Sequence, residues 1–419
     1  MLKELAFRHV GPAERFEAEL APRLNLFTGD NGLGKSFLLD VAWWALTGTW
    51  AGNPAWPRRG AQARPEIRYT IKDKSDKTAT SAFDFSRQAW PRPQKRRGTP
   101  SLVVYARVDG GFSVWDPARN LERLEPGDAE RPDAYHFTTD ALWNGLEVER
   151  KVLCNGLIRD WVNWQNQPDQ DQAAPFQLLA RVIEQLAPHP SEWMKPGKPI
   201  RVSIEDVRDI PTLEFPYGTI PVIHASAGVK RILGLAYLLV WAWYEHTHAA
   251  RLLNQTPTDQ LVLLVDEVES HLHPRWQRSI LPAILNVSTG LQASVSTQVM
   301  ATTHAPLILA SVEPLFDPDQ DRLFLFDLAE QGVTLAPVSW VKQGDTVGWL
   351  TSEVFGLKQA RSREAEAAIE AAEAFMRGDR QALPQHLQTR EQIHQELVRL
   401  LPGHDPFWPR WIVSAEAAR

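Results

Sequence analysis

A glycine-rich stretch, Gly29 to Ser36 (GDNGLGKS), constrains the fold more than any other part of this 419-residue chain. It follows an apolar, strand-like run, Leu24 to Phe27, and precedes a helix-like run, Phe37 to Leu46. Glycines let a loop turn its N–H groups inward, a lysine can reach the outer phosphates, and a serine hydroxyl can bind Mg²⁺. Phosphates held there would lie at the N-terminus of the following helix. The stretch predicts a P-loop for ATP and Mg²⁺ in an α/β fold, with a plain glycine-rich turn as the alternative. The predicted nucleotide-binding residues are Gly29, Asp30, Asn31, Gly32, Leu33, Gly34, Lys35, Ser36 and Phe37, and Ser36 is also a predicted metal ligand.

Two further strand-like runs end in polar residues that suit hydrolysis. Leu261 to Val265 leads into Asp266 and Glu267, and Val299 to Thr303 leads into His304. A continuous apolar run is typical of a central parallel strand, whose C-terminal end opens on the site. We expect Asp266 to support Mg²⁺, Glu267 to polarise the attacking water and His304 to sense the γ-phosphate. The alternatives are surface acids and an ordinary polar histidine at strand ends.

A second phosphate site is predicted at Ser226, Ala227 and Gly228, which precede a long apolar run. The N-terminus of a helix attracts anions. Since a second such site beside the same P-loop would be redundant, we expect these residues to contact the nucleotide of another subunit. The apolar run Ile232 to Tyr244 is too short for a membrane span, which needs about 20 residues, and predicts a buried core helix.

These motifs together resemble the ABC-type ATPases of the SMC, RecF and OLD-like group. The resemblance covers most of residues 1–345 and includes the segment VESHLHP after Glu267. It implies a P-loop NTPase head with a central, mostly parallel sheet, and two ATP molecules held between two heads. Its implied roles are phosphate and Mg²⁺ binding for Lys35 and Ser36, metal support for Asp266, catalytic base for Glu267, γ-phosphate contact in trans for Ser226 and Gly228, and switch histidine for His304.

The chain also departs from the pattern of this group. The usual Leu-Ser-Gly-Gly-Gln signature is replaced by Ala225 to Val229, ASAGV, which fits the OLD-like branch better than a transporter. Gln88, in FSRQAW, is the candidate glutamine-loop metal ligand. The alternating Glu269, His271 and His273 could hold zinc, but this segment resembles the dimer-contact loop of the group.

The insertion between the P-loop and Asp266 has no sustained heptad pattern, so the chain is predicted to be a head without coiled-coil arms. Alternating residues around EIRYTI and SAFDFS, and a hairpin cue at Asp109-Gly110-Gly111, predict antiparallel strands. The predicted domains are an ATPase core at 1–60 and 200–345, an antiparallel β subdomain at 61–138, a helical insertion at 139–199, and a C-terminal helical partner-docking region at 346–419.

Partners are suggested by two basic loops and by the C-terminal tail. The loops Trp56 to Pro65 and Trp90 to Pro100 combine basic and aromatic residues, so they could bind DNA, or be solvated loops or dock an acidic partner. In the tail, Asp405 to Trp411 (DPFWPRW) either folds back on the core or binds a partner. The candidate DNA-binding residues are Arg58, Arg59, Arg92, Lys95, Arg96 and Arg97.

Composition narrows the setting without fixing the function. A net charge of −6 excludes a global basic field that would attract nucleic acid. Cys154 is the only cysteine, so a disulfide within the chain is impossible and a reducing compartment is expected. The N-terminal segment MLKELAFRHV lacks the apolar core of a signal peptide. We expect a cytoplasmic, soluble protein that does not contact a membrane.

The sequence therefore predicts an ATPase that works as a homodimer or a higher oligomer. After His304 no acidic cluster suggests a nuclease domain, so any cutting is assigned to another polypeptide. The chain resembles the ATPase components of anti-phage systems such as Septu, which implies control of a separate effector such as a nuclease. The alternative is a DNA-repair clamp resembling RecF; a transporter ATPase fits the altered signature less well.

Overall fold

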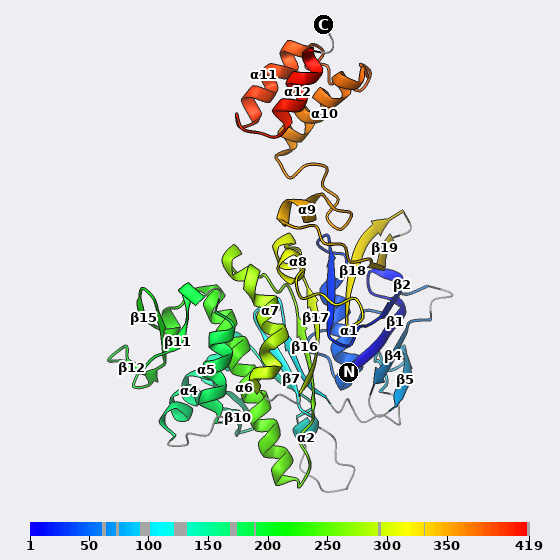
Figure 1. Ribbon diagram of the computed structural model, residues 1–419. Coiled ribbons are helices and arrows are strands. Elements are labelled where there is room, and N and C mark those ends of the chain that lie inside the picture. Colours follow the sequence, from blue (N-terminus) through cyan, green and yellow to red (C-terminus); the bar gives the residue numbers. More distant parts are fainter. Residues whose placement is uncertain are drawn as a thin grey trace. The chain divides into compact units, whose positions relative to one another are not determined.

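Five parallel strands lie side by side at the centre of the first of two units, Met1–Gly344 (Figure 1). In this computed structural model the described residues are 1–60, 64–72, 75–92, 101–120, 132–167, 174–187, 190–291, 295–330 and 332–416. The full sheet has eight strands in the order β19-β18-β3-β17-β16-β6-β7-β8. The predicted α/β fold with a central, mostly parallel sheet is confirmed. The strands are β3 (Leu24–Gly29), β6 (Leu102–Ala106), β7 (Phe112–Trp115), β8 (Tyr135–Phe137), β16 (Gln260–Val265), β17 (Ser296–Thr302), β18 (Asp321–Ala329) and β19 (Gly332–Val338).

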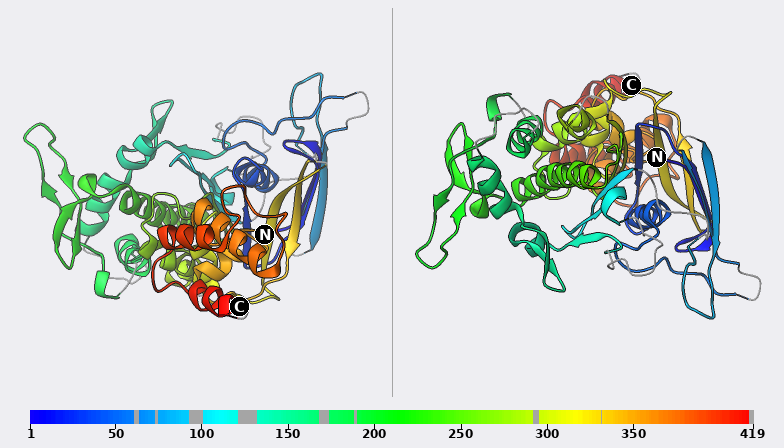
Figure 2. Two further views of the ribbon diagram at one scale, coloured as in Figure 1. Left: turned by 90° about the horizontal axis from the view of Figure 1, so that it is seen from above. Right: turned by 90° about the horizontal axis from the view of Figure 1, so that it is seen from below.

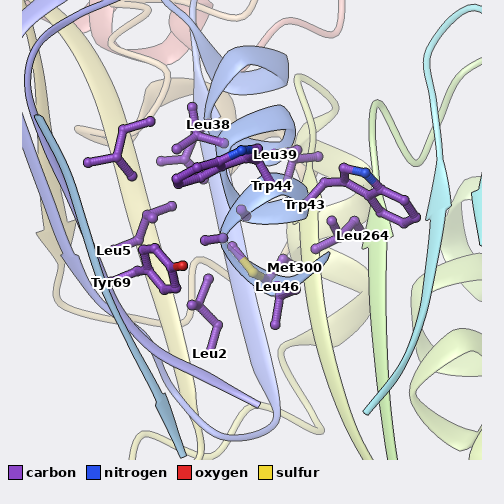
Figure 3. Packing of buried hydrophobic residues seen from close by; sticks show 14 of the residues in the cluster. Leu2, Leu5, Leu38, Leu39, Trp43, Trp44, Leu46, Tyr69, Leu264 and Met300 are labelled. Atoms are coloured by element: carbon purple, nitrogen blue, oxygen red, sulfur yellow. The ribbon is translucent and has the colours of Figure 1, made fainter. Parts of the chain in front are cut away.

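Helix α1 (Lys35–Thr47) lies between this sheet and a second, antiparallel sheet (Figure 2). The second sheet has the order β2-β1-β4-β5. Because α1 is apolar almost all round, it buries residues on both sides: Trp44 faces Leu5 and Tyr69, and Trp43 faces Leu264 (Figure 3). The helix that follows the P-loop is thereby clamped between two layers. The strands of the second sheet are β1 (Leu2–Val10), β2 (Ala13–Glu19), β4 (Glu66–Lys72) and β5 (Asp76–Ala82).

The predicted antiparallel subdomain at 61–138 needs correction. In its first half, β4 pairs with β1, which was expected in the ATPase core, and β5 pairs with β4 at the edge of the same sheet. Its second half, β6 to β8, joins the main sheet, where β6 runs parallel to β16. All five residues of β6 are buried, so this strand needs cover on both faces and finds it at the centre. The predicted hairpin turn is present, with β6 and β7 antiparallel and Gly110 at a φ of 81°.

Helices cover the main sheet on the side away from α1 (Figures 1 and 2). The longest, α6 (Ala227–Leu252), is buried along most of its middle. At its far end His246 bonds the Asp116 carboxylate through Nδ1, at 2.7 Å, and accepts the Thr258 N–H at 2.9 Å. No helix among the described residues is both long and apolar enough to cross a membrane. The other helices are α2 (Pro117–Asn120), α3 (Thr139–Asn144), α4 (Leu157–Asn166), α5 (Pro175–Gln185), α7 (Pro274–Leu291) and α8 (Pro306–Val312).

The predicted helical insertion at 139–199 also contains strands, and the segment 200–221 is not part of the central sheet. A hairpin, β9 (Leu146–Val148) with β10 (Lys151–Cys154), separates α3 from α4. Short antiparallel strands then occupy the stretch predicted to be a linker and core. Polar side chains alternate with apolar ones there, which suits a sheet with one solvated face. These strands are β11 (Lys195–Pro196), β12 (Ile200–Arg201), β13 (Asp209–Ile210), β14 (Thr212–Phe215) and β15 (Gly218–Pro221).

The second unit, Asp345–Arg419, has its own small core. Phe407 and Trp411 in α12 are only 8% and 2% exposed, because they pack against α10 and α11. An ion pair between Arg361 and Asp405 ties the start of the unit to the turn before α12. The aromatic tail segment thus builds the core of its own unit, which neither alternative from the sequence anticipated. Its helices are α9 (Thr346–Thr351), α10 (Arg363–Arg377), α11 (Arg390–Leu400) and α12 (Phe407–Glu416).

Candidate nucleotide site

The loop between β3 and α1 has the backbone that phosphate binding requires. Gly29, Gly32 and Gly34 all have positive φ, at 131°, 79° and 103°. At Gly29 a Cβ atom would lie 2.2 Å from the carbonyl oxygen of Phe326, so only glycine fits there. Gly34 caps α1 without a side chain, and the first turn of the helix contains no acid. The first N–H groups of α1 are therefore left for an anion.

Lys35 is folded back on the loop. Its Nζ donates to the carbonyl oxygens of Gly29, at 2.8 Å, and Asp30, at 2.7 Å. Burial lowers the pKa of Lys35, while the nearby carboxylates of Glu267 and Asp266 act in the opposite direction. The lysine thus lies between the loop and the acids that follow β16, and an incoming phosphate would replace the carbonyls as its partner.

The acids after β16 and the histidine after β17 come together at the same sheet edge. His304 Nε2 is 3.0 Å from Glu267 Oε1, and its Nδ1 is 3.3 Å from the carbonyl oxygen of Gly29. Asp266 is 1% exposed, whereas the Glu267 side chain is 34% exposed and so accessible to water. The arrangement holds a carboxylate and an imidazole next to the P-loop, as general-base chemistry on water at a γ-phosphate would need.

Thr302, the last residue of β17, was not predicted as part of the site. Its Oγ1 donates to Asp266 Oδ1 and accepts the N–H of Glu267, both at 2.7 Å. Glu269 was weighed only as a zinc ligand, but its Oε1 accepts the N–H of His304 at 2.5 Å. Among the described residues, no cluster of three or more His, Cys, Asp or Glu could hold a metal ion, so the zinc alternative gains no support.

Further unpredicted residues lie near Asp266. Asp40 follows Ser36 by one helical turn, and the Tyr105 hydroxyl donates to its Oδ1 at 3.1 Å. Burial raises the pKa of Asp40 to about 6, with a smaller contribution from Asp266. Arg231, on α6, donates to the carbonyl oxygen of Asp266 at 2.7 Å. The sequence offers one signal for these residues: Asp40 lies four residues after Ser36, which places both on the same side of the helix.

Gln88, the candidate glutamine-loop residue, does not join the site. It is exposed in the turn after β5, has a φ of 51°, and donates its Nε2 to the carbonyl oxygen of Phe85 at 2.6 Å. No hydrogen bond links it to Ser36 or Asp266 in the described part of the chain. The position beside Asp266 at the end of β6 is taken by Arg107, since Asp266 N–H bonds the carbonyl of Ala106. The sequence pattern had indicated β6 as part of a separate subdomain, so the strand end next to Asp266 was not recognised.

The Ser226 segment begins α6 as predicted. Ser226 is exposed, and its Oγ accepts the N–H of Val229 at 3.4 Å, which caps the helix and leaves its hydroxyl proton free to donate. A Cβ atom at Gly228 would lie 2.7 Å from the carbonyl oxygen of His271, so the first turn packs closely on the loop after Glu267. His271 itself is exposed, with a φ of 63°. Ser226 and this loop therefore form one continuous exposed edge.

A hollow of about 470 Å³ lies beside the P-loop and is lined by His9, Glu14, Trp56, Arg58 and Arg59. The turn between β1 and β2 connects the two features. A Cβ atom at Gly11 would lie 2.4 Å from the ring of Phe37, and one at Gly34 would lie 2.6 Å from Pro12. Trp56 is 62% exposed. The hollow offers an open indole ring and two guanidinium groups next to the phosphate loop.

The two basic loops differ from what the sequence suggested. Trp90 is buried and donates to the carbonyl oxygen of Ala55, so it cannot stack on a ligand. Arg92 bonds the carbonyl of Gly48 and pairs with Asp133. Arg58 and Arg59 border the hollow beside Trp56. Lys95, Arg96 and Arg97 lie outside the described residues.

Known proteins share the segment that contains Ser226, the acids and His304. Residues 217–310 match the family described as "AAA domain, putative AbiEii toxin, Type IV TA system". The chain is 35% identical over 96 residues to the Septu protein PtuA of Bacillus mycoides (strain KBAB4), covering 23% of this chain and 12% of that protein. It is 28% identical over 132 residues to the Retron Ec83 probable ATPase of Escherichia coli, covering 29% of this chain and 21% of that protein. These matches support a resemblance of this segment to the ATPases of the SMC, RecF and OLD-like group.

Solved structures also resemble this chain, at a distance. The SMC head domain from Thermotoga maritima aligns with a TM-score of 0.43 and 15% identity, over 81% of this chain and 99% of that chain. A structure of the recombination mediator protein RecF gives 0.38 and 12%, over 81% of this chain and 98% of that chain. The chain spans about an eighth and a fifth of the lengths of its PtuA and Ec83 relatives.

The residues of the candidate site fit a nucleotide with Mg²⁺. The uncapped start of α1 and the inward-turning glycine loop suit phosphate oxygens, and Lys35 supplies a positive charge. Ser36 and Asp266 offer a hydroxyl and a carboxylate, which are the oxygen ligands that Mg²⁺ prefers. Bound Mg²⁺ would neutralise charge on the phosphates, while the chain's own residues orient water and hold the loop.

Proposed function

We propose that this protein hydrolyses ATP between two copies of itself and uses that cycle to control a separate effector protein in defence against phage. The names of two relatives, a Septu protein and a retron ATPase, support the defence setting. The observation that carries the hydrolysis is the contact of His304 with both Glu267 and the P-loop carbonyl of Gly29. This contact brings together the proposed base Glu267, the proposed switch histidine and the P-loop.

We infer two copies because the exposed edge at Ser226 is suited to bind a phosphate, while the P-loop of the same chain already has its own helix N-terminus for that purpose. Ser226 has a free hydroxyl proton and starts a 26-residue helix, whose positive end favours an anion. Its neighbour in space is the exposed loop at His271. A second copy that presents its P-loop to this edge would complete both sites, with Ser226 and Gly228 on the γ-phosphate.

Hydrolysis and dimer formation can be tested with the same variants. Glu267→Gln removes the base and keeps the shape of the side chain, so turnover should fall about 100-fold or more while ATP stays bound. With ATP and Mg²⁺ this variant should run as a dimer in size-exclusion chromatography with light scattering. Ser226→Arg should bind ATP and remain a monomer, whereas the same change at Ser75, an exposed residue between β4 and β5, should leave the dimer intact. A Glu267→Gln protein that stays monomeric with ATP would refute the shared site.

The effector should be recovered with the ATP-locked protein. Glu267→Gln protein is captured from its native host with ATP and Mg²⁺, next to Glu267→Gln/Ser226→Arg as the matched control. A stoichiometric nuclease or another toxic enzyme, present only with the single variant, would support effector control. Recombination proteins and DNA in its place would favour a DNA-repair clamp resembling RecF, for which the exposed Arg58 and Arg59 are the candidate DNA contacts.

We assign effector docking to the C-terminal unit. Deleting its last segment is a poor test, because α12 supplies Phe407 and Trp411 to the core of that unit. Val398, Ile412 and Val413 are 58%, 51% and 65% exposed and can be changed without opening the core. Ile412→Glu with Val413→Glu should lose the captured effector and keep ATP turnover. Retention of the effector by this variant would contradict docking through α12.

A further inference from the structure

Thr302 lies at the edge of the main sheet where β3, β16 and β17 end next to the candidate nucleotide site. It ends β17, pairs with Phe27 of β3, and lies one residue past the pair formed by Ala301 and Val265 of β16. Its side chain is fully buried. A buried hydroxyl must find partners inside the protein, and the partners here are both acids of the site.

The hydroxyl of Thr302 has one possible orientation. The N–H of Glu267 can only donate, so it points at an oxygen lone pair, at 2.7 Å. The single hydroxyl proton is then free to donate to Asp266 Oδ1, also at 2.7 Å. A hydrogen bond to an ionised carboxylate is among the stronger ones in proteins. One hydroxyl thus fixes the side chain of Asp266 and the backbone of Glu267 together.

The backbone of Glu267 needs such a restraint. Its φ of 46° lies in the left-handed region, which is costly for a residue with a Cβ atom. Thr302 holds the turn twice, because its carbonyl oxygen also accepts the N–H of Val268 at 3.1 Å. In this turn the Glu267 carboxylate reaches His304 Nε2. Without the hydroxyl, the N–H of Glu267 loses its partner and the turn keeps only its backbone bonds, so the direction of the carboxylate is less restrained.

We propose that Thr302 is a positioning residue for metal-dependent ATP hydrolysis, which sets the carboxylate of Asp266 for Mg²⁺ and the carboxylate of Glu267 for water. With Oδ1 engaged by Thr302, the other oxygen of Asp266 is left for a metal-bound water. The inference rests on the proposed hydrolysis, and it adds a residue that touches neither nucleotide nor metal. A residue that only filled the core would stabilise the fold without altering the dependence on Mg²⁺.

The test compares Thr302→Val, which has a similar shape and no hydroxyl, with Thr302→Ser, which keeps the hydroxyl. Loss of an outer-shell partner of a metal ligand typically costs about 10- to 100-fold in activity or metal affinity. We expect kcat to fall by that factor in Thr302→Val, the Mg²⁺ midpoint to rise about tenfold, and KM for ATP to change less than about threefold. Thr302→Ser should recover most of the activity. Thr212→Val is the matched control, since Thr212 is equally buried and its hydroxyl donates to the carbonyl of Lys198, at 2.9 Å, away from the acids of the site.

Two results would overturn the inference: an unchanged Mg²⁺ midpoint in a folded Thr302→Val protein, or equal losses in the Val and Ser variants. If Thr302→Val does not fold, as judged by thermal unfolding, Thr302→Ser and Thr302→Cys decide, because only the former keeps a strong hydroxyl donor. If the unaltered protein does not hydrolyse ATP, the proposed function fails by itself. The role of Thr302 is then judged on the Mg²⁺ dependence of binding of a fluorescent ATP analogue.

Discussion

Replacing Asp40 with asparagine should stabilise the first unit at alkaline pH. Asp40 lies one turn after Ser36 in α1, and burial raises the pKa of its carboxyl group from 3.8 to about 6. Asparagine keeps an oxygen in the place where the Tyr105 hydroxyl donates. It carries no charge at any pH, so the cost of burying the ionised carboxylate disappears.

The size and the sign of the effect follow from the two pKa values. A carboxyl group that binds its proton more tightly in the folded state adds stability below pH 3.8 and loses it as the pH rises through about 6. Above both values the ionised folded state is penalised by about 3 kcal/mol, at 1.36 kcal/mol for each pKa unit. At pH 5 about half of that penalty remains, since the unfolded chain is already mostly ionised there. Asp40→Asn should therefore gain about 3 kcal/mol at pH 8 and about half as much at pH 5.

The assay is urea unfolding of the full chain at pH 5 and pH 8, followed by tryptophan fluorescence, with EDTA and without nucleotide. Asp266→Asn is a useful comparison because it removes a nearby charge and keeps Asp40. It should reduce the penalty on Asp40 only slightly, as burial is the larger cause. An Asp40→Asn protein that is less stable at pH 8, or whose gain does not change with pH, would show that the carboxylate is not penalised in the folded state.

Three more outcomes are expected. Trp56→Ala should weaken ATP binding about tenfold, since stacking on a base is worth ~1–3 kcal/mol. Binding of inorganic tripolyphosphate, which has no base, should be unaffected. Equal losses for both ligands would show that the adenine base does not stack on Trp56. Cys154 should not react with Ellman's reagent at pH 8 until the protein is denatured, because burial raises its thiol pKa to about 12 and its Sγ contacts the Tyr237 hydroxyl at 3.0 Å; rapid reaction of the native protein would contradict this. Trp411→Ala should cost about 3–5 kcal/mol in the C-terminal unit, so that limited trypsin digestion removes that unit while ATP binding persists; unchanged protease resistance would mean that α12 is not needed for its core.

Most of the correct predictions came from patterns within short stretches of the sequence. The P-loop could be predicted because glycine spacing, a preceding strand and a following helix all lie within one short stretch. The strands β16 and β17 were predictable from continuous apolar runs that end abruptly in polar residues. Their neighbours in the sheet were not, since pairing between distant strands leaves little trace in either sequence. For this reason β6 was expected in a separate subdomain, and Gln88 was chosen as a metal ligand although the structure places it in an exposed turn.

The unpredicted site residues are those whose role depends on such pairing. Thr302 resembles any buried strand residue until β17 is known to adjoin β16. Asp40 resembles a polar residue on a surface helix until α1 is known to be enclosed by two sheets. In the tail, Phe407 and Trp411 suggested a docking patch because aromatic residues are crowded there. Three short amphipathic helices can bury such residues among themselves, and the sequence does not indicate which residues they bury.

The long helix α6 connects two distant parts of the first unit. An α-helix rises 1.5 Å per residue, so its 26 residues form a strut of about 39 Å. Ser226 is at one tip, and the bonds of His246 with Asp116 and Thr258 anchor the opposite end. If a phosphate of a second copy contacts Ser226 as proposed, we expect a shift of α6 to reach the region near Asp116 and β7, remote from the site, where another protein could detect that ATP is bound.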